Sequence, residues 1–179
     1  MKKWNAVINV NEHGFKRAFA LLEEFGFVKK TEFFNVLLMQ AYDLPKMLET
    51  LKERSSKDPL YLSCLSRLIP ISRTFIFQSP EEFESKSSDI VLKWVFELAG
   101  KGFHVRMRRR GFKGKLSSVT EEHFLDDVLL DAMEKKGSPG HITFDNPDFI
   151  IAVETVGQWA GLSLWKREDL EQYPFVRLG

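Results

Sequence analysis

Two β-rich runs near the C-terminal end of the chain constrain its fold more than any other feature. The runs are FIIAVETV, at residues 149–156, and WAGLSLW, at residues 159–165, and only Gly157 and Gln158 separate them. A two-residue connection that contains glycine between two strands is typical of a β-hairpin. We therefore expect a sheet with at least one antiparallel pair.

The segment ahead of the hairpin predicts a strand followed by a long helix. Apolar and polar residues alternate from Phe103, which predicts a strand with one row of side chains facing the core and the other facing outward. The inward row is Phe103, Val105 and Met107, and the outward row is His104, Arg106 and Arg108. Ser118 and Glu121 then form a capping-box pattern, and apolar residues at helical spacing continue towards Gly137.

The first half of the chain alternates strand and helix patterns in the order β-α-β-α-β. The predicted strands are residues 4–10, 33–40 and 71–77, and the predicted helices are residues 15–22 and 44–54. Asn11 is the expected cap of the first helix, and Gly26 is the residue expected to stop it. A further short helix is predicted over residues 61–68, with Asp58 as its cap and Pro70 after its end.

A domain boundary is expected near Gln78, where a turn at Ser79-Pro80 is followed by two acidic residues suited to a helix N-terminus. A length of 179 residues allows either one larger domain or two small ones. The predicted fold class is α/β of the α+β kind: a small α/β sandwich over residues 1–78, followed by a second α/β domain over residues 79–179.

Composition indicates a folded protein of a reducing compartment. Hydrophobic residues make up 44% and charged residues 28% of the chain, which argues against disorder. The single cysteine, Cys64, excludes an internal disulfide. The sequence has neither an apolar run of about 20 residues nor a signal-peptide pattern at its N-terminus, so we expect no membrane span and a cytoplasmic location.

Positive charge is concentrated in one segment, residues 101–115. This segment holds seven basic residues and no acidic one, and these are Lys101, Arg106, Arg108, Arg109, Arg110, Lys113 and Lys115. The 26 basic residues of the chain less these 7 leave 19, against 25 acidic residues, so the rest of the chain is acidic. Like charges at this density lower stability unless an anion offsets them, and arginine offers bidentate donors to phosphate. We therefore favour a polyanion as the ligand, with a solvated face or an acidic protein partner as the alternatives.

Patterns of known catalytic and metal sites are absent. Gly114-Lys115 is followed by Leu116, and Arg109 occupies the position of the first P-loop glycine, so the segment is not a P-loop. The four histidines are dispersed without cysteine companions, and Cys64 lies among apolar residues. Asp126 and Asp127 are adjacent, so their side chains diverge by about 100° on a helix. We expect no catalytic residues, no metal and no cofactor.

The order of these segments resembles a THUMP domain, the RNA-binding module of several tRNA-modifying proteins. The resemblance lies in FHVRMRRRGFKG, a capped helix, and ITFDNPDFIIAVETVGQWAGLSLW, and it covers about residues 79–170. Its most specific part is DNPDFIIAVETVG, in which Asn146, Pro147 and Asp148 match a family turn that precedes an apolar strand. The first 78 residues resemble the ferredoxin-like domain that usually accompanies THUMP.

The resemblance implies that the paired domains bind tRNA around the acceptor stem and 3′ end and position it for a catalytic domain. Since the 179 residues contain no such domain, the chain is similar to stand-alone THUMP proteins such as the adaptor of the tRNA N4-acetylcytidine acetyltransferase. The expected RNA contacts are all seven basic residues of the segment, including Lys101 and Arg109. Among them, Arg106, Arg108 and Arg110 match the basic strand of the family, and Lys113 and Lys115 match the loop after it. Three functions follow for comparison: a non-catalytic tRNA adaptor, which we favour; a protein-interaction module whose basic segment docks an acidic partner; and an enzyme with an unrecognised site.

Overall fold

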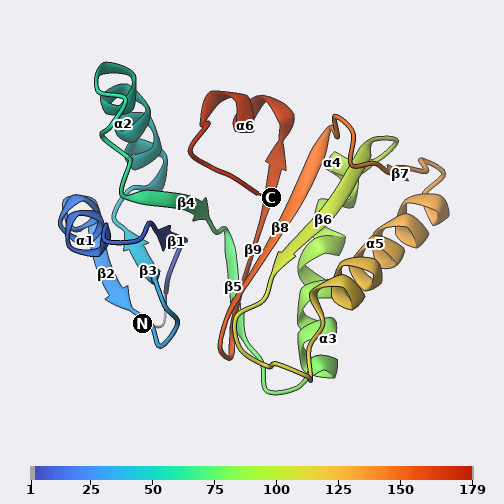
Figure 1. Cartoon of the computed structure of the whole chain (residues 1–179). Helices are drawn as coiled ribbons and strands as arrows, with labels where there is room; N and C mark the ends of the chain where they lie inside the picture. The colour runs from blue at the N-terminus through green and yellow to red at the C-terminus, as the bar shows by residue number, and fades with distance from the viewer. Residues whose placement is uncertain (1–2, 179) are drawn as a thin grey trace. The chain divides into compact units, whose positions relative to one another are not determined.

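The computed structural model describes residues 3–178, which divide into two compact units (Figure 1). Unit 1 holds residues 3–71 and 170–177, and unit 2 holds residues 72–169 and 178. The last helix, α6 (Arg167–Gln172), crosses the division between them. Both units combine helices with a sheet, which confirms the predicted mixed α/β fold class.

Unit 1 is a sheet with two helices on one face. Its elements are β1 (Ala6–Val10), α1 (Phe15–Glu23), β2 (Gly26–Lys30), β3 (Val36–Ala41), α2 (Leu44–Lys57) and β4 (Leu65–Pro70). The strand order is β2-β3-β1-β4, and every neighbouring pair is antiparallel. Leu22 of α1 and Leu51 of α2 are buried in one core with Ile8 of β1. The βαββαβ order with this strand arrangement is the ferredoxin-like pattern that the sequence predicted.

One predicted element of unit 1 was wrong, and one strand was not predicted. Residues 65–70 form β4 rather than part of a helix, and they pair with β1. A short apolar run fits a buried strand as well as it fits a helix. Here the run forms a strand, because it pairs with the side of β1 that β3 leaves open. Gly26 was expected to stop α1, but the helix ends at Glu23 and Gly26 begins β2, a strand that the sequence did not predict. A Cβ atom at Gly26 would lie 2.1 Å from the carbonyl oxygen of Gln40, so this close approach of β2 to β3 requires glycine.

The predicted cap of α1 was also wrong. The helix begins after Gly14, and no side chain caps it. The Asn11 side-chain amide instead donates to the carbonyl oxygen of Ser63 at 2.7 Å, just before β4. The predicted helix over residues 44–54 is confirmed as α2. Asp43 caps it by accepting a hydrogen bond from the backbone N–H of Lys46, and Pro45 lies in the first turn.

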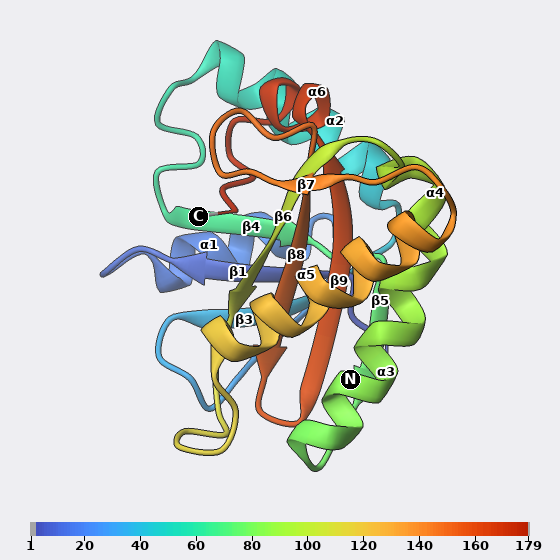
Figure 2. The same cartoon turned by 90° about the vertical axis from the view of Figure 1, so that its right-hand side faces the viewer.

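Unit 2 is a mixed five-stranded sheet whose strand order is β5-β9-β8-β6-β7. Its elements are β5 (Arg73–Ile76), α3 (Pro80–Val91), a 3-10 turn η1 (Leu92–Trp94), α4 (Val95–Leu98), β6 (Gly102–Arg108), α5 (Ser118–Lys135), β7 (His141–Ile142), β8 (Phe149–Val156) and β9 (Trp159–Lys166). β6 is parallel to both β7 and β8, whereas β8 and β9 form the predicted antiparallel hairpin, with Val156 opposite Trp159. Figure 2 shows α3 and α5 lying across one face of this sheet, where they bury the apolar row of β6.

The division of the chain differs from the expected one at residue 78. β5 pairs with β9, with Arg73 opposite Leu162, so this strand belongs to unit 2. Near the other end of the chain, Tyr173 and Phe175 pack against the core of unit 1. One further detail differs: the cap of α5 is Ser117, whose hydroxyl accepts a hydrogen bond from the N–H of Thr120, and Ser118 is the first helical residue. The residues that pair between β5 and β9 are 83 to 89 positions apart, so no local signal assigns β5 to unit 2, which explains the misplaced boundary.

Candidate nucleic-acid interface

β6 presents two arginines on the sheet face opposite α3 and α5. Phe103, Val105 and Met107 are buried in the core of unit 2, as the alternation predicted. Arg106 and Arg108 are exposed on the other face, about 7 Å apart along the strand. His104 was predicted to face solvent with them, but only 8% of it is exposed. Its ring packs against Phe144, and its Nδ1–H donates to the carbonyl oxygen of Thr143 at 2.9 Å.

Two acidic side chains of α5 accept hydrogen bonds from backbone N–H groups of β6 that no strand pairs with. β7 pairs only with Gly102 and Phe103, so the backbone N–H groups further along β6 need other acceptors. The carboxylate of Glu122 accepts from Met107 N at 2.7 Å, and the carboxylate of Asp126 accepts from Val105 N at 3.2 Å. These two residues are one helical turn apart, so α5 is fixed along the strand that carries the arginines.

The buried acid Asp126 predicts a pH-dependent stability. Burial raises the pKa of Asp126 from 3.8 to about 6, although the hydrogen bond from Val105 N opposes the shift. An acid whose folded pKa is raised contributes stability that is lost as the pH rises from about 4 through about 6. Asp126→Asn keeps an oxygen acceptor for Val105 and carries no charge. The free energy of unfolding of this variant, relative to wild type, should rise by about 2–3 kcal/mol between pH 4 and pH 7.

Urea unfolding followed by circular dichroism at several pH values measures this difference. Asp127→Asn is the matched control, because it makes the same substitution at the neighbouring position of α5, where the side chain is exposed. A difference between Asp126→Asn and wild type that is the same at every pH would contradict the assignment.

Arg110 is a structural residue of unit 2. Its Nη1 donates to Glu154 Oε2 of β8 at 2.7 Å, and the exposed fractions of the two side chains are 10% and 2%. Its backbone is also fixed, because Arg110 N donates to Thr155 Oγ1 at 3.0 Å and Arg110 O accepts from Gly157 N at 2.9 Å. Arg109 turns back on the loop, where its guanidinium donates to the carbonyl oxygen of Gly111. Both arginines were predicted to contact RNA, but these contacts occupy them within the fold.

The loop after β6 is anchored by one aromatic residue. Phe112 stacks on the buried Phe77 with ring centroids 4.8 Å apart, and its carbonyl oxygen accepts from both Lys115 N and Leu116 N. Gly111 and Gly114 both have positive φ, which glycine tolerates without strain. Lys113 and Lys115 therefore project into solvent from an ordered loop, next to the strand that carries Arg106 and Arg108.

Lys101 and the turn at Asn146, Pro147 and Asp148 lie at the other end of β6. Lys101 is about 23 Å along the strand from Arg108. Asp148 Oδ2 accepts from Gly102 N at 2.9 Å, and Asp148 Oδ1 pairs with Arg167 at 3.0 Å. The hydrogen bond from Gly102 N, together with Arg167 and Lys101, lowers the pKa of Asp148. Asn146 has a φ of 47°, and its carbonyl oxygen accepts from Arg167 at 2.8 Å. The turn thus ties the starts of β6, β8 and α6 together.

The structure therefore separates the seven basic residues into three groups. Arg106 and Arg108 are exposed on the strand with Lys113 and Lys115 in the adjoining loop, Lys101 lies at the far end of the strand, and Arg109 and Arg110 are engaged within the fold. Sequence reasoning did not identify Glu154 as the partner of Arg110, or Glu122 as the acceptor for the backbone N–H of Met107. For Glu154 the sequence did offer a signal, because its carboxylate is the one charge within the apolar run FIIAVETV. A buried charge requires a partner elsewhere in the fold.

The described residues hold neither a metal-binding cluster nor a membrane-spanning helix. Residues 3–178 contain no group of three or more His, Cys, Asp and Glu side chains placed to hold a metal ion. Over the same range, no helix combines the length and apolar character needed to cross a membrane.

Comparison with known proteins finds similarity in structure but not in sequence. The sequence matches no protein-family profile and no curated protein. Similar solved structures include PH1313 from Pyrococcus horikoshii OT3, at 14% identity and a TM-score of 0.60, over 92% of this chain and 55% of that chain. A 4-thiouridine synthetase in a complex with RNA and bound ATP matches at 13% identity and a TM-score of 0.55, over 91% of this chain and 41% of that chain. TrmN from Thermus thermophilus matches at 14% identity and a TM-score of 0.51, over 90% and 44%. This chain spans about half the length of these proteins, and identities this low establish the fold alone.

Proposed function

We propose that this chain is a THUMP-type RNA-binding protein that binds tRNA at its acceptor stem and 3′ end. The observation that carries the proposal is the group of four exposed cations on and beside β6: Arg106, Arg108, Lys113 and Lys115. Within residues 3–178, no ion pair joins any of these four side chains to an acidic residue. Their charge is therefore available to phosphate, which arginine binds through two parallel N–H donors.

Two further observations support the proposal. The fold is similar to that of a 4-thiouridine synthetase whose structure contains RNA. In addition, the sequence turn that carries the THUMP resemblance, Asn146 to Asp148, is bonded to the start of the basic strand through Gly102. RNA recognition by such a surface would rest on the backbone and on unpaired ends, because side chains cannot read the narrow major groove of an RNA helix.

The proposal includes a role beyond binding. We propose that the chain presents bound tRNA to a separate cytoplasmic tRNA-modifying enzyme, such as an acetyltransferase, and performs no catalysis itself. The resemblance to stand-alone THUMP adaptors supports this part. Turnover of tRNA by the purified chain alone would contradict it.

Binding of transcribed tRNA by the purified chain over a salt series tests the proposal in vitro. The logarithm of the association constant should fall linearly with the logarithm of salt concentration, with a slope of about −0.7 to −0.9 per phosphate contacted. Duplex DNA of matched length is the control, and it should compete poorly because it lacks the 2′-hydroxyls and the unpaired end. Equal competition by DNA, or affinity that does not respond to salt, would contradict tRNA binding through this surface. Recovery of a protein partner that persists after nuclease treatment, without any bound tRNA, would favour the protein-interaction module.

A further inference from the structure

An aromatic ring lies exposed beside the basic strand, in the connection between β7 and β8. Phe144 has 70% of its surface exposed. Its ring lies 4.8 Å from the ring of His104, centroid to centroid, with a tilt of 38°. One side of the phenyl ring is therefore backed by an imidazole, and the remainder is open to solvent.

The segment that carries Phe144 is held in place from both ends. Thr143 N donates to the carbonyl oxygen of Phe103 at 3.0 Å, and Thr143 O accepts from the ring of His104. On the other side, Asp148 exchanges two hydrogen bonds with Gly102: Asp148 N donates to Gly102 O at 2.8 Å, and Gly102 N donates to the Asp148 carboxylate. The ring is thus presented by a fixed loop, so little conformational entropy remains to be lost when a ligand packs on it.

The position of Phe144 relates it to the exposed arginines. His104, Arg106 and Arg108 alternate along one face of β6, with about 7 Å between successive members. Burial lowers the pKa of His104, which keeps the imidazole neutral beside Arg106. The face therefore presents an open aromatic ring over His104, followed along the strand by two guanidinium groups. A groove that combines cations for the backbone with an aromatic ring for a base is the usual arrangement for single-stranded nucleic acid.

Other exposed aromatic rings of the chain have different surroundings. Phe34 is 86% exposed, but it lies in the connection between β2 and β3 of unit 1. Phe96 is 80% exposed, but the ammonium group of Lys136 lies 3.9 Å from its ring centroid. Phe27 and Tyr42 of unit 1 contact each other edge to face, with centroids 5.6 Å apart. Phe144 differs from these rings because it packs on His104, which lies in the same row of β6 as Arg106.

We propose that Phe144 is a stacking platform for one unpaired base of the bound RNA, while Arg106 and Arg108 hold the adjoining phosphates. This inference rests on the proposed function and adds a specific contact to it. It assigns to unit 2 a preference for RNA with a single-stranded end over a fully paired helix.

Two synthetic RNA hairpins test the inference. Both have the same stem, and one carries an unpaired four-nucleotide 3′ tail with 2-aminopurine in the tail. The chain of 179 residues should bind the tailed hairpin more tightly than the blunt one, and binding should quench the 2-aminopurine fluorescence. Phe144→Ala should weaken binding of the tailed hairpin by about 5- to 100-fold and leave the blunt hairpin unchanged. Phe144→Trp should retain the preference, whereas Phe144→Leu, which keeps apolar area but no ring, should lose it.

The outcomes separate this inference from the function on which it rests. Salt-dependent binding of both hairpins by wild type, with Phe144→Ala binding each as tightly as wild type does, overturns the stacking contact and leaves the proposed function standing. Failure of wild type to bind either hairpin overturns both. Unchanged far-ultraviolet circular dichroism and melting temperature show that the variants are folded, which is expected for a side chain as exposed as Phe144.

Discussion

Arg110→Ala should lower the free energy of unfolding by about 3–5 kcal/mol. The substitution leaves the carboxylate of Glu154, of which 2% is exposed, without the guanidinium that lies 2.7 Å away. Breaking a buried ion pair costs more than the pair itself contributes, because the carboxylate was desolvated on folding and loses the guanidinium that lies within hydrogen-bond distance of it. Urea unfolding of the full chain measures the change. Arg108→Ala is the matched control, since its side chain is exposed and its loss should change stability by no more than about 0.5 kcal/mol.

A double variant tests the reason for this loss. Arg110→Met with Glu154→Leu removes both charges of the pair and keeps apolar volume, so its free energy of unfolding should be higher than that of Arg110→Ala. If Arg110→Ala were as stable as Arg108→Ala, the ion pair would have no structural role. Arg110 would then return to the set of candidate RNA contacts.

Removing Arg106 and Arg108 together should weaken tRNA binding by roughly 20- to 60-fold at about 0.1 M salt. Each phosphate contact that is lost removes a counterion-release contribution of about 0.7–0.9 in the salt slope, so the slope should become shallower by about 1.5. Filter binding of the variant Arg106→Ala with Arg108→Ala, over a salt series, measures both quantities. Both side chains are exposed on a strand whose other face forms the core, so the fold should be unaffected.

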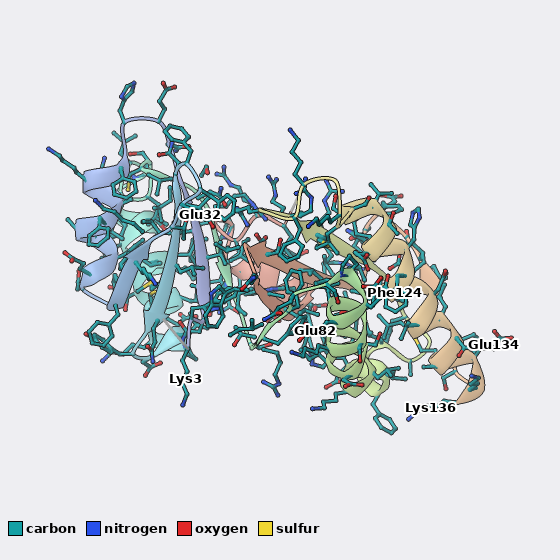
Figure 3. All side chains as sticks on the ribbon, turned by 90° about the horizontal axis from the view of Figure 1, so that it is seen from below. Lys3, Glu32, Glu82, Phe124, Glu134 and Lys136 are labelled. Carbon is teal, nitrogen blue, oxygen red and sulfur yellow. The ribbon has the colours of Figure 1, made fainter. Side chains whose placement is uncertain are left out.

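Lys93→Ala with Lys136→Ala is the matched control for charge. It also removes two cations from unit 2, but from the helical layer, and Figure 3 shows Lys136 at the C-terminal end of α5. This control should bind tRNA within about threefold of wild type. Equal losses in the two double variants would mean that net charge, rather than the β6 surface, determines the affinity.

The parts of the fold that could be predicted from the sequence are those with local signals. The β8–β9 hairpin follows from two β-rich runs separated by Gly157-Gln158, and α5 follows from its cap and its apolar spacing. β2 and β4 gave weak signals, because one is a mostly exposed edge strand and the other is a short apolar run. The placement of β5 depends on a partner strand 83 to 89 residues away, so no local pattern could assign it to unit 2.

The candidate site was predictable as a segment but not side chain by side chain. Alternation placed Arg106 and Arg108 outward, and both are exposed. The same reasoning could not show that Glu154 of β8 lies opposite Arg108 of β6. It also could not show that Arg110, two residues further along the chain, turns inward and pairs with this carboxylate. Nor could it place Phe144 on His104, since 40 residues separate them in the sequence and only the return of the chain along β7 brings them together.

Crosslinking the protein to RNA in cells and sequencing the attached RNA tests the central claim most directly. The proposed function predicts enrichment of tRNA, with crosslinks concentrated at acceptor stems and 3′ ends. The variant Arg106→Ala with Arg108→Ala should lose most of this enrichment, and the variant Lys93→Ala with Lys136→Ala should keep it. Recovery of no RNA class above background, or of tRNA equally with both variants, would contradict the claim that this chain binds tRNA through β6.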